Sequence, residues 1–275
     1  MTQTTVITGG TGGMGLATAR ILGRDHRIVI ADLDQGRIDQ AVSDLTGLGI
    51  DAIGFVCDIT DGSAANRLFE NAEEGGHHVR AVVHTAGISP QMGTPDRIAR
   101  INGTGTVNIA QAFLKRASEG DALVNVASTA GHGLPKILIP FRSFRLAQTD
   151  PASFERVIVK RARVFGKKLH AGITYGLSKA FVIWYTRSLA GAFGSKGARV
   201  VSVSPGSFDT AMGKLEKDHG ASEFLKVSAI KRFGHPEEIA AVLAFCASEA
   251  PGYLTGTDIL VDGGTQAGQE FRTNH

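Results

Sequence analysis

The chain has 275 residues, of which 43% are hydrophobic and 20% are charged, and its formal net charge is +3. This length and balance indicate one compact globular domain and exclude an intrinsically disordered chain. The 35 glycines follow no collagen-like repeat and instead predict many tight turns and helix starts. The two cysteines, Cys57 and Cys246, lie in apolar contexts and are too few for a disulfide framework, which favours a reducing, cytoplasmic location.

The amino-terminal segment and the charge distribution narrow the class of protein further. The first strand-like segment starts at residue 4 with no charged or apolar leader region before it, so we expect no signal peptide. No apolar run reaches the roughly 18 residues that a membrane span needs, so we expect no integral membrane segment. The basic excess is local: residues 134–174 contain nine Lys and Arg against two acidic residues, which leaves 20 basic and 24 acidic residues elsewhere. We therefore expect no nucleic-acid partner, and no motif predicts a metal site.

Short β-branched runs alternate with longer amphipathic segments along the chain. Strands are expected at residues 4–8, 26–31, 51–57, 79–84, 121–127, 198–204 and 257–261. Helices are expected between them at 13–23, 34–47, 61–74, 95–117, 175–194 and 235–248. This alternation predicts right-handed crossovers and a doubly wound α/β fold, with a parallel sheet of about seven strands covered by helices on both faces. No linker or low-complexity tract divides the chain, so we expect a single domain over residues 1–275.

Chemically active residues follow the carboxyl ends of the expected strands, where ligands bind in an open parallel sheet. The first strand runs into "TGGTGGMG", which matches GxGxxG at Gly10, Gly12 and Gly15. The same segment also matches the spacing TGxxxGxG at Thr8, Gly9, Gly13 and Gly15. Glycines between a strand and a helix let backbone N–H groups approach a pyrophosphate at the positive end of the helix. The segment therefore predicts a dinucleotide-binding loop.

Asp32 lies about 20 residues after this loop, at the end of the second strand, where a carboxylate can accept hydrogen bonds from both hydroxyls of an adenine ribose. A 2′-phosphate would be repelled there. An NADP site would call for Arg or Lys in the loop or directly after the strand, but Thr11, Gly12 and Leu33 occupy those positions. The sequence thus favours NAD, although Asp32 precedes a helix and could also serve as its cap.

A tyrosine and a lysine, Tyr175 and Lys179, are four residues apart in "YGLSK" and share one face of an expected helix. A nearby ammonium favours the phenolate and brings a phenol with a pKa of about 10 closer to the working range of an acid or base. Ser128, at the end of the fifth strand, is the candidate for holding a substrate oxygen. Together these three residues predict a site for proton transfer.

With these motifs the chain resembles a classical short-chain dehydrogenase/reductase over essentially its whole length. The motifs that carry the resemblance are, in chain order, "TGGTGGMG", "HTAG", "NGTGT", "NVASTAG", "YGLSK", "PGSFDT" and "KRFGHPEEIAAVLAFCASEAPGYLTGTDILVDGG". The resemblance implies a Rossmann fold, and catalysis by Ser128, Tyr175 and Lys179. It also implies that Asn102, in "RINGTG", sits at a helix distortion that holds a water passing protons between the lysine and solvent.

The resemblance also extends the expected cofactor site beyond the glycine loop. It makes Asp58 and Ile59 adenine contacts, and it assigns the loop from Pro205 to Thr210 to the nicotinamide carboxamide. The residues expected to contact NAD are Gly9, Thr11, Gly12, Gly13, Met14, Gly15, Asp32, Leu33, Asp58, Ile59, Thr85, Ala86, Gly87, Tyr175, Lys179, Pro205, Gly206, Phe208 and Thr210.

Three departures from the family pattern stand out. The usual Asn-Asn-Ala-Gly is replaced by His84-Thr85-Ala86-Gly87, where a strand-end histidine favours a structural role over a catalytic one. Gly87 and Asn102 are only 15 residues apart, while Ser128 and Tyr175 are 47 apart. The short first gap and the long second gap resemble the 3α-hydroxysteroid dehydrogenase/carbonyl reductase branch.

The extra residues, at about 134–173, have their own pattern. Asp150 and Pro151 predict the cap and first residue of a helix. Its apolar stripe is expected at Phe154, Val157, Ile158, Phe165 and Leu169, and its basic face at Arg156, Lys160, Arg163 and Lys167. The basic face is interpreted as solvated, with attraction of an acidic substrate or a membrane surface as the alternative.

We also expect the inserted helix to affect assembly. Family members usually form tetramers through the helices that bear the asparagine and the tyrosine. We expect the inserted helix to cover or remodel that interface and leave a dimer formed through residues 235–262, so that the homo-oligomer is a dimer or a modified tetramer.

Two classes of function remain open at this stage. The first is an NAD-dependent oxidoreductase that moves a hydride between nicotinamide and a secondary alcohol or ketone, with an NADP-linked 3-ketoacyl reductase as the nearest rival. The second is a dinucleotide-binding sensor without turnover. Specificity is expected in residues 88–95, in the insertion, and in a lid at about 207–230. Apolar residues there favour a hydrophobic, steroid-like alcohol or serve as lid packing: Leu134, Ile137, Leu138, Ile139, Phe141, Phe208, Met212, Leu215 and Phe224.

Overall fold

The computed structural model describes residues 3–217 and 225–272, so Phe224 and part of the expected lid lie outside the described residues. Seven strands form one wholly parallel sheet in the order β3-β2-β1-β4-β5-β6-β7. The strands are β1 Gln3–Thr8, β2 Arg27–Asp32, β3 Ala52–Val56, β4 His78–His84, β5 Ala122–Val126, β6 Arg199–Pro205 and β7 Asp258–Val261. Each lies where the β-branched runs predicted it, and the doubly wound single domain is confirmed.

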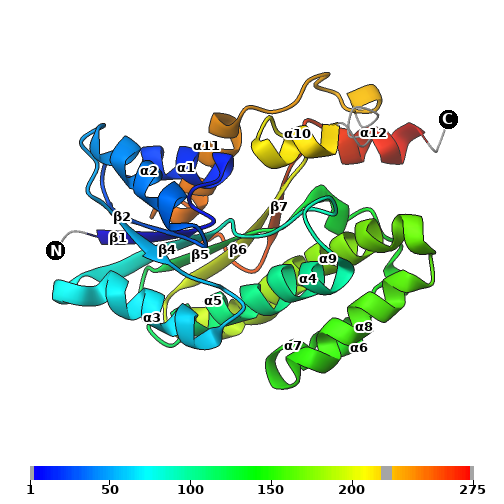
Figure 1. The fold of residues 1–275 in the computed structure, drawn as a ribbon, viewed down its shortest axis with the longest axis horizontal. Helices are drawn as coiled ribbons and strands as arrows, with labels where there is room; N and C mark the ends of the chain where they lie inside the picture. Colours follow the sequence, from blue (N-terminus) through cyan, green and yellow to red (C-terminus); the bar gives the residue numbers. More distant parts are fainter. Residues whose placement is uncertain (1–2, 218–224, 273–275) are drawn as a thin grey trace.

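Helices cover both faces of the sheet (Figure 1). One face carries α1 Gly13–Leu22, α2 Gln35–Thr46 and α11 Pro236–Ala247; the other carries α3 Gly62–Glu73, α5 Gly105–Leu114 and α9 Lys167–Gly194. Short helices α10 Ala211–Lys217 and α12 Thr265–Arg272 lie beyond the carboxyl edge of the sheet (Figure 1). Among the described residues, no helix is both long enough and apolar enough to cross a bilayer.

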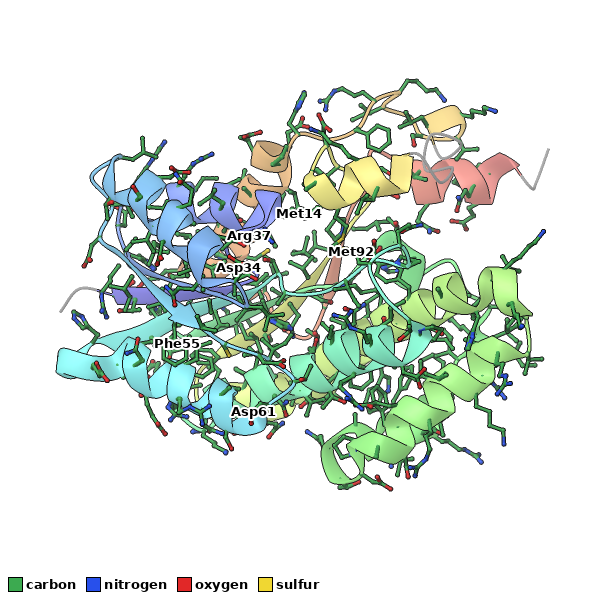
Figure 2. The ribbon with its side chains drawn as sticks, in the orientation of Figure 1. Met14, Asp34, Arg37, Phe55, Asp61 and Met92 are labelled. Atoms are coloured by element: carbon green, nitrogen blue, oxygen red, sulfur yellow. The ribbon has the colours of Figure 1, made fainter. Side chains whose placement is uncertain are left out.

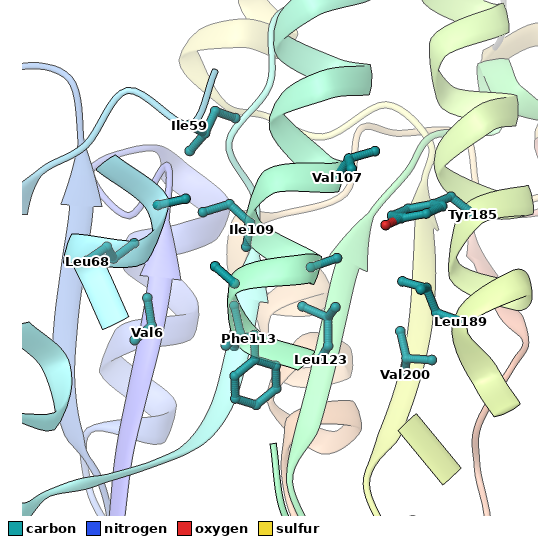
Figure 3. Packing of buried hydrophobic residues seen from close by; sticks show 14 of the residues in the cluster. Val6, Ile59, Leu68, Val107, Ile109, Phe113, Leu123, Tyr185, Leu189 and Val200 are labelled. Carbon is teal, nitrogen blue, oxygen red and sulfur yellow. The ribbon is translucent and has the colours of Figure 1, made fainter. Parts of the chain in front are cut away.

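The central strands are buried on both sides, which explains their continuous β-branched runs. Val6 and Ile7 of β1 are fully buried but belong to separate clusters, because successive side chains of a strand point to opposite faces. Figure 3 shows the cluster that contains Val6, where Phe113 of α5 and Tyr185 of α9 pack over the sheet. These two cores fix the sheet between its helix layers and align the carboxyl ends of the strands along one edge.

The expected helix at residues 95–117 is interrupted at Asn102, as the family resemblance implied, and it ends at Leu114. It consists of α4 Pro95–Ala99, a π-helical turn Arg100–Thr104, and α5. Asn102 lies in the π turn, and its side chain bonds the backbone of Ile88. The single wider turn allows Asn102 to face inward, as π turns at functional sites often do for a polar residue.

The inserted segment folds into three helices, α6 Phe141–Phe144, α7 Leu146–Thr149 and α8 Pro151–Arg163. The predicted start of α8 is confirmed, since the Asp150 carboxylate accepts a hydrogen bond from the Ser153 N–H at 3.0 Å and Pro151 is the first helical residue. Figure 1 shows α8 alongside α9, and the two helices pack together.

Aromatic packing attaches the insertion to the rest of the domain. Phe154 of α8 is fully buried, its ring lies 4.5 Å from that of Phe181 in α9, and it fills the space that a side chain at Gly103 would need. The insertion therefore covers the surface formed by α9 and the π turn.

Two boundaries near this insertion differ from the sequence prediction. Helix α9 begins at Lys167 and not near 175, because the chain reverses at Gly166, which has a φ of +83°. Leu169 was predicted to join the apolar stripe of the inserted helix, but it lies in the first turn of α9 and is 56% exposed. Phe154 and Ile158 of the predicted stripe are buried as expected.

Candidate active site

The predicted site residues gather at the carboxyl edge of the sheet, around the point where the strand order reverses between β1 and β4. Open α/β sheets bind their ligands at such a switch point. The glycine loop follows β1, Asp32 ends β2, Thr85 follows β4, Ser128 follows β5, and Pro205 ends β6. Parallel strands deliver all five segments to one edge, although they are far apart in the sequence.

Two glycines of the loop after β1 have no room for a side chain. A Cβ on Gly9, whose φ is +66°, would lie 2.7 Å from the Ala86 nitrogen, and a Cβ on Gly15 would lie 2.9 Å from the Thr85 hydroxyl. The Thr85 hydroxyl donates a hydrogen bond to the Thr8 carbonyl at 2.8 Å. Threonine at 85 thus ties the β4 turn to the glycine loop and preserves the turn despite the departure from the family pattern.

Asp32 is held by this loop. One of its carboxylate oxygens accepts hydrogen bonds from the Thr11 N–H, at 3.3 Å, and the Thr11 hydroxyl; the other accepts from the Leu33 N–H at 2.8 Å. The cap of α2 is Asp34, which accepts from the Arg37 N–H, so Asp32 is not the cap of that helix. Its carboxylate is fixed beside the loop that is predicted to bind the pyrophosphate.

Sequence reasoning missed a basic residue at this position. The guanidinium of Arg37 donates to the Thr11 carbonyl at 3.4 Å, although Arg37 is neither in the glycine loop nor directly after β2. Figure 2 shows Arg37 on α2, and Met14 at the start of α1. The only sequence signal was position: Arg37 is one turn into α2, close enough for a long side chain to reach back to the loop.

Lys179 is nearly buried, with 6% of its surface exposed, and its ammonium donates to the Val126 carbonyl at 2.9 Å. It lies 5.8 Å from the centre of the Tyr175 ring, as the four-residue spacing predicted. Asn102 is also buried; its side chain accepts from the Ile88 N–H at 2.9 Å and donates to the Ile88 carbonyl at 3.0 Å. Gly87 separates the two polar groups, since a Cβ there would be 3.1 Å from Asn102 Oδ1 and 3.5 Å from Lys179 Nζ.

The loop that carries Ser128 packs against the same part of α9. A Cβ on Gly131 would lie 2.8 Å from the Lys179 carbonyl carbon, and one on Gly176 would lie 3.1 Å from the Ala130 carbonyl oxygen. The Ser128 hydroxyl oxygen accepts a hydrogen bond from the Ala130 N–H at 3.2 Å. The 47-residue separation in sequence is thus closed in space, because the insertion leaves from this loop and returns at the start of α9.

The remaining residues that were expected to contact the cofactor differ in their exposure. Asp58 is exposed and accepts from Thr60, whereas the Ile59 side chain is buried against Gly105. The Phe208 ring is also buried, packed on Gly234, so it points into the core. Two other residues of the loop after β6 lie at the carboxyl edge of the sheet. Gly206 donates to the Val261 carbonyl, and the Thr210 methyl group would be 3.0 Å from a Cβ on Gly13.

His84 is fully enclosed and has a structural environment. Its Nδ1 forms a 2.6 Å hydrogen bond with the Thr8 hydroxyl, and its Nε2 forms a 3.1 Å hydrogen bond with the Thr106 hydroxyl. Burial, followed by the charge of Lys179, lowers the pKa of His84 to about 3. The imidazole therefore stays neutral at physiological pH and links β1, β4 and α5 beneath the site.

Two cavities lie at the opposite, amino-terminal edge of the sheet, around Arg80 and Glu249. Arg199, which lines the first, donates to the carbonyls of Cys246 and Ser248 at the end of α11 and to that of Leu254 in the segment that follows. Arg199 thus caps the carboxyl end of α11, which gives this arginine a structural role.

Comparison with known proteins agrees with the fold and the motifs. A family model described as short chain dehydrogenase matches residues 3–139, and one described as Enoyl-(Acyl carrier protein) reductase matches residues 160–266. The short-chain dehydrogenase/reductase bsc3 of Alternaria brassicicola is 30% identical over 271 residues, covering 97% of both chains. A 3-oxoacyl-[acyl-carrier-protein] reductase, MabA of Mycobacterium tuberculosis, is 29% identical over 282 residues, covering 98% of this chain and 94% of its own.

Solved structures show the same fold. A short-chain dehydrogenase from Burkholderia cenocepacia in complex with NADP superposes with a TM-score of 0.76 at 25% identity, covering 95% of this chain and 97% of that one. The chain therefore belongs to the short-chain dehydrogenase/reductase family, whose members are oxidoreductases that bind a nicotinamide dinucleotide. The residues between the two matched segments fall within the inserted helices.

The buried His84 generates a prediction about acid stability. Its pKa is lower in the folded protein than the ordinary value of about 6.5, so below that pH the unfolded chain binds the proton and the folded protein does not. Stability should fall as the pH drops from about 6.5 toward 3. We expect this group to account for a loss of about 1–2 kcal/mol between pH 7 and pH 5, measured by urea unfolding.

The variant His84→Gln should lose less stability over the same range, whereas His77→Gln, at a partly exposed turn, should behave like the wild type. A loss in His84→Gln equal to that of the wild type would show that His84 does not carry this pH dependence.

Proposed function

We propose that the protein is an NAD-dependent oxidoreductase that transfers a hydride between nicotinamide and a secondary alcohol or ketone. The observation that carries the proposal is that Tyr175, the buried Lys179 and the Ser128 loop come together at one turn of α9, while Gly9 and Gly15 in the loop after β1 have no room for side chains. A dinucleotide fits these residues, because the closely packed glycines present backbone N–H groups at the start of α1 and Asp32 offers a carboxylate for a ribose.

In this proposal the nicotinamide, when bound, supplies or accepts the hydride, and the protein handles the proton. Tyr175 passes the proton to or from the substrate oxygen, and the Ser128 hydroxyl holds that oxygen. The Lys179 ammonium favours the phenolate form of the tyrosine. Asn102 keeps the π turn and the Ile88 backbone in place at the inner end of the site, where a water could connect the lysine to solvent.

Two alternatives to this proposal remain, and a specific observation favours the first of them. An NADP-linked 3-ketoacyl reductase is favoured by Arg37, which reaches the Thr11 carbonyl, and by relatives named 3-oxoacyl-[acyl-carrier-protein] reductase. A dinucleotide-binding sensor without turnover would need only the glycine loop and Asp32, and the presence of the complete Asn102, Ser128, Tyr175 and Lys179 set weighs against it.

The substrate is proposed to be hydrophobic, with a steroid-like alcohol as one candidate and the 3α-hydroxysteroid dehydrogenase/carbonyl reductase branch as the narrower relationship. Leu134 supports this, since its side chain packs on Gly176, directly after Tyr175. Ile137, by contrast, is 83% exposed and does not line the site. A screen of NAD reduction over secondary alcohols, including steroids, would identify the substrate.

The proton-transfer role predicts the effect of Tyr175→Phe. Turnover should fall by at least about 100-fold, while NAD binding should stay within a few-fold, because the lost hydroxyl moves a proton and does not hold the dinucleotide. Lys179→Ala should lose both turnover and binding. The measurements are turnover of an alcohol identified in the screen and NADH fluorescence titration.

Tyr253→Phe is the matched control, because Tyr253 is fully exposed and the same hydroxyl is removed. If Tyr175→Phe kept most of the activity, the tyrosine would lose its proposed role and the sensor alternative would gain support.

The Asp32 carboxylate predicts the choice of cofactor. NAD(H) should bind at least about tenfold more tightly than NADP(H), since repulsion between the carboxylate and a 2′-phosphate exceeds about 1.4 kcal/mol. Asp32→Ala should narrow this difference. Arg37→Gln should weaken the binding of NADP(H) alone and so widen the difference between the two affinities.

Arg24→Gln, an exposed arginine just beyond the far end of α1, removes the same charge and should change neither affinity. Fluorescence titration of each variant with both cofactors gives the measurement. Equal affinities of the wild type for NAD(H) and NADP(H) would defeat the assignment of NAD.

The inserted helices lead to a proposal about assembly. Because α8 covers the surface of α9 and the π turn, we propose that subunits associate through residues 235–262, where edge strand β7 and exposed Phe245 and Leu260 offer a surface for a second copy. Light scattering should give the mass of a dimer, and Phe245→Asp should shift it toward a monomer. A tetramer unaffected by Phe245→Asp would contradict this arrangement.

A further inference from the structure

Six cations lie at the end of α8, at the start of α9 and in the turn at Lys136–Leu138, which Arg161 of α8 contacts. We call this region the cationic tip; it consists of Lys136, Lys160, Arg161, Arg163, Lys167 and Lys168. None of the six forms an ion pair with an acidic residue in the part of the chain that the structure describes. The two acids of the insertion are used elsewhere: Asp150 caps α8, and Glu155 binds Arg100 and Thr104. The tip therefore has a strong positive charge that nearby acids do not neutralise.

Large aliphatic side chains project from the same tip. Ile137 is 83% exposed, Val164 is 81% exposed and Leu169 is 56% exposed. Arg161 fixes Ile137 beside the end of α8, since its guanidinium donates to the carbonyls of Ile137 and Leu138 at 3.1 and 3.2 Å. Aliphatic groups this exposed contribute nothing to the core, although the chain has buried Phe154 and Ile158 of the same insertion completely.

The tip lies at the periphery of the molecule. Figure 1 shows the α8–α9 turn at the outer end of the molecule, on the right in that view. Gly166, with a φ of +83°, allows the sharp reversal and has no atom near the place where its Cβ would lie. Separate aliphatic groups on an exposed, cationic turn suit the headgroup layer of a bilayer, which accepts apolar groups without a preformed groove. A folded acidic protein would have to supply a complementary pocket for each of them.

We propose that the cationic tip docks on anionic lipid surfaces, with Val164, Leu169 and Ile137 entering the headgroup layer and the lysines and arginines attracted to the lipid charge. Helix α9 begins in this tip, and Tyr175 lies eight residues after Lys167, about 12 Å along the helix. Docking would thus hold the start of the Tyr175 helix at the membrane. The lipid inference stands on the tip alone and does not depend on the proposed function.

Vesicle flotation of the full-length protein tests the proposal. The wild type should float with phosphatidylcholine vesicles that contain about 30% phosphatidylglycerol and should remain unbound with pure phosphatidylcholine. Lys167→Gln/Lys168→Gln should weaken binding to the anionic vesicles about thirtyfold, from about 1 kcal/mol per lysine. Val164→Ser/Leu169→Ser should weaken it at least about fivefold while the charge is unchanged.

The matched control is Arg20→Gln/Arg24→Gln, which removes two exposed cations at the end of α1 and should leave binding at the wild-type level. Absence of flotation with anionic vesicles would overturn the proposal, as would equal losses in the lysine and arginine variants. Undiminished binding of the serine variant would also overturn it, because the aliphatic groups would then have no role. Retention on poly-glutamate beads without flotation would assign the tip to an acidic protein instead.

Discussion

The buried ammonium of Lys179 is the constraint on which the rest of the site depends. A cation removed from water needs polar partners, and the Val126 carbonyl at the end of β5 supplies one at 2.9 Å. This bond fixes α9 against the carboxyl edge of the sheet. It also requires small neighbours, because Gly87 leaves space for the lysine on one side and Gly131 lets the Ser128 loop approach α9 on the other. The position of Tyr175 follows from that of the lysine.

The surroundings of Lys179 avoid a second positive charge. Burial lowers the pKa of His84, and the charge of Lys179 disfavours its protonation further. The imidazole therefore acts as a neutral hydrogen-bonding link between Thr8 and Thr106. Asn102 completes this layer through the Ile88 backbone, which an ordinary α-helical turn would place differently. The polar groups beneath Tyr175 and Lys179 are thus largely paired with one another or with the backbone.

The insertion adds a new surface without disturbing this arrangement. It leaves from the loop after β5 and returns at the start of α9, two segments that are already in contact, so its length does not affect the geometry of the site. Phe154 attaches it by filling the space above Gly103. One side of α8 is buried, and its basic side and the Gly166 turn stay exposed. The same short segment therefore has a packed face and a charged tip.

The sequence by itself determined the features that depend on neighbouring residues. Alternation of strands and helices predicted the sheet, the spacing of glycines predicted the loop after β1, and Asp150 with Pro151 predicted the start of α8. Contacts between distant segments decided the rest. The hydrogen bonds between Asn102 and the Ile88 backbone depend on how the two segments pack, the approach of Arg37 to Thr11 depends on how α2 packs, and the exposure of Leu169 depends on the reversal at Gly166. Local patterns record the preferences of a segment, whereas these three features arise only when separate segments are packed against one another.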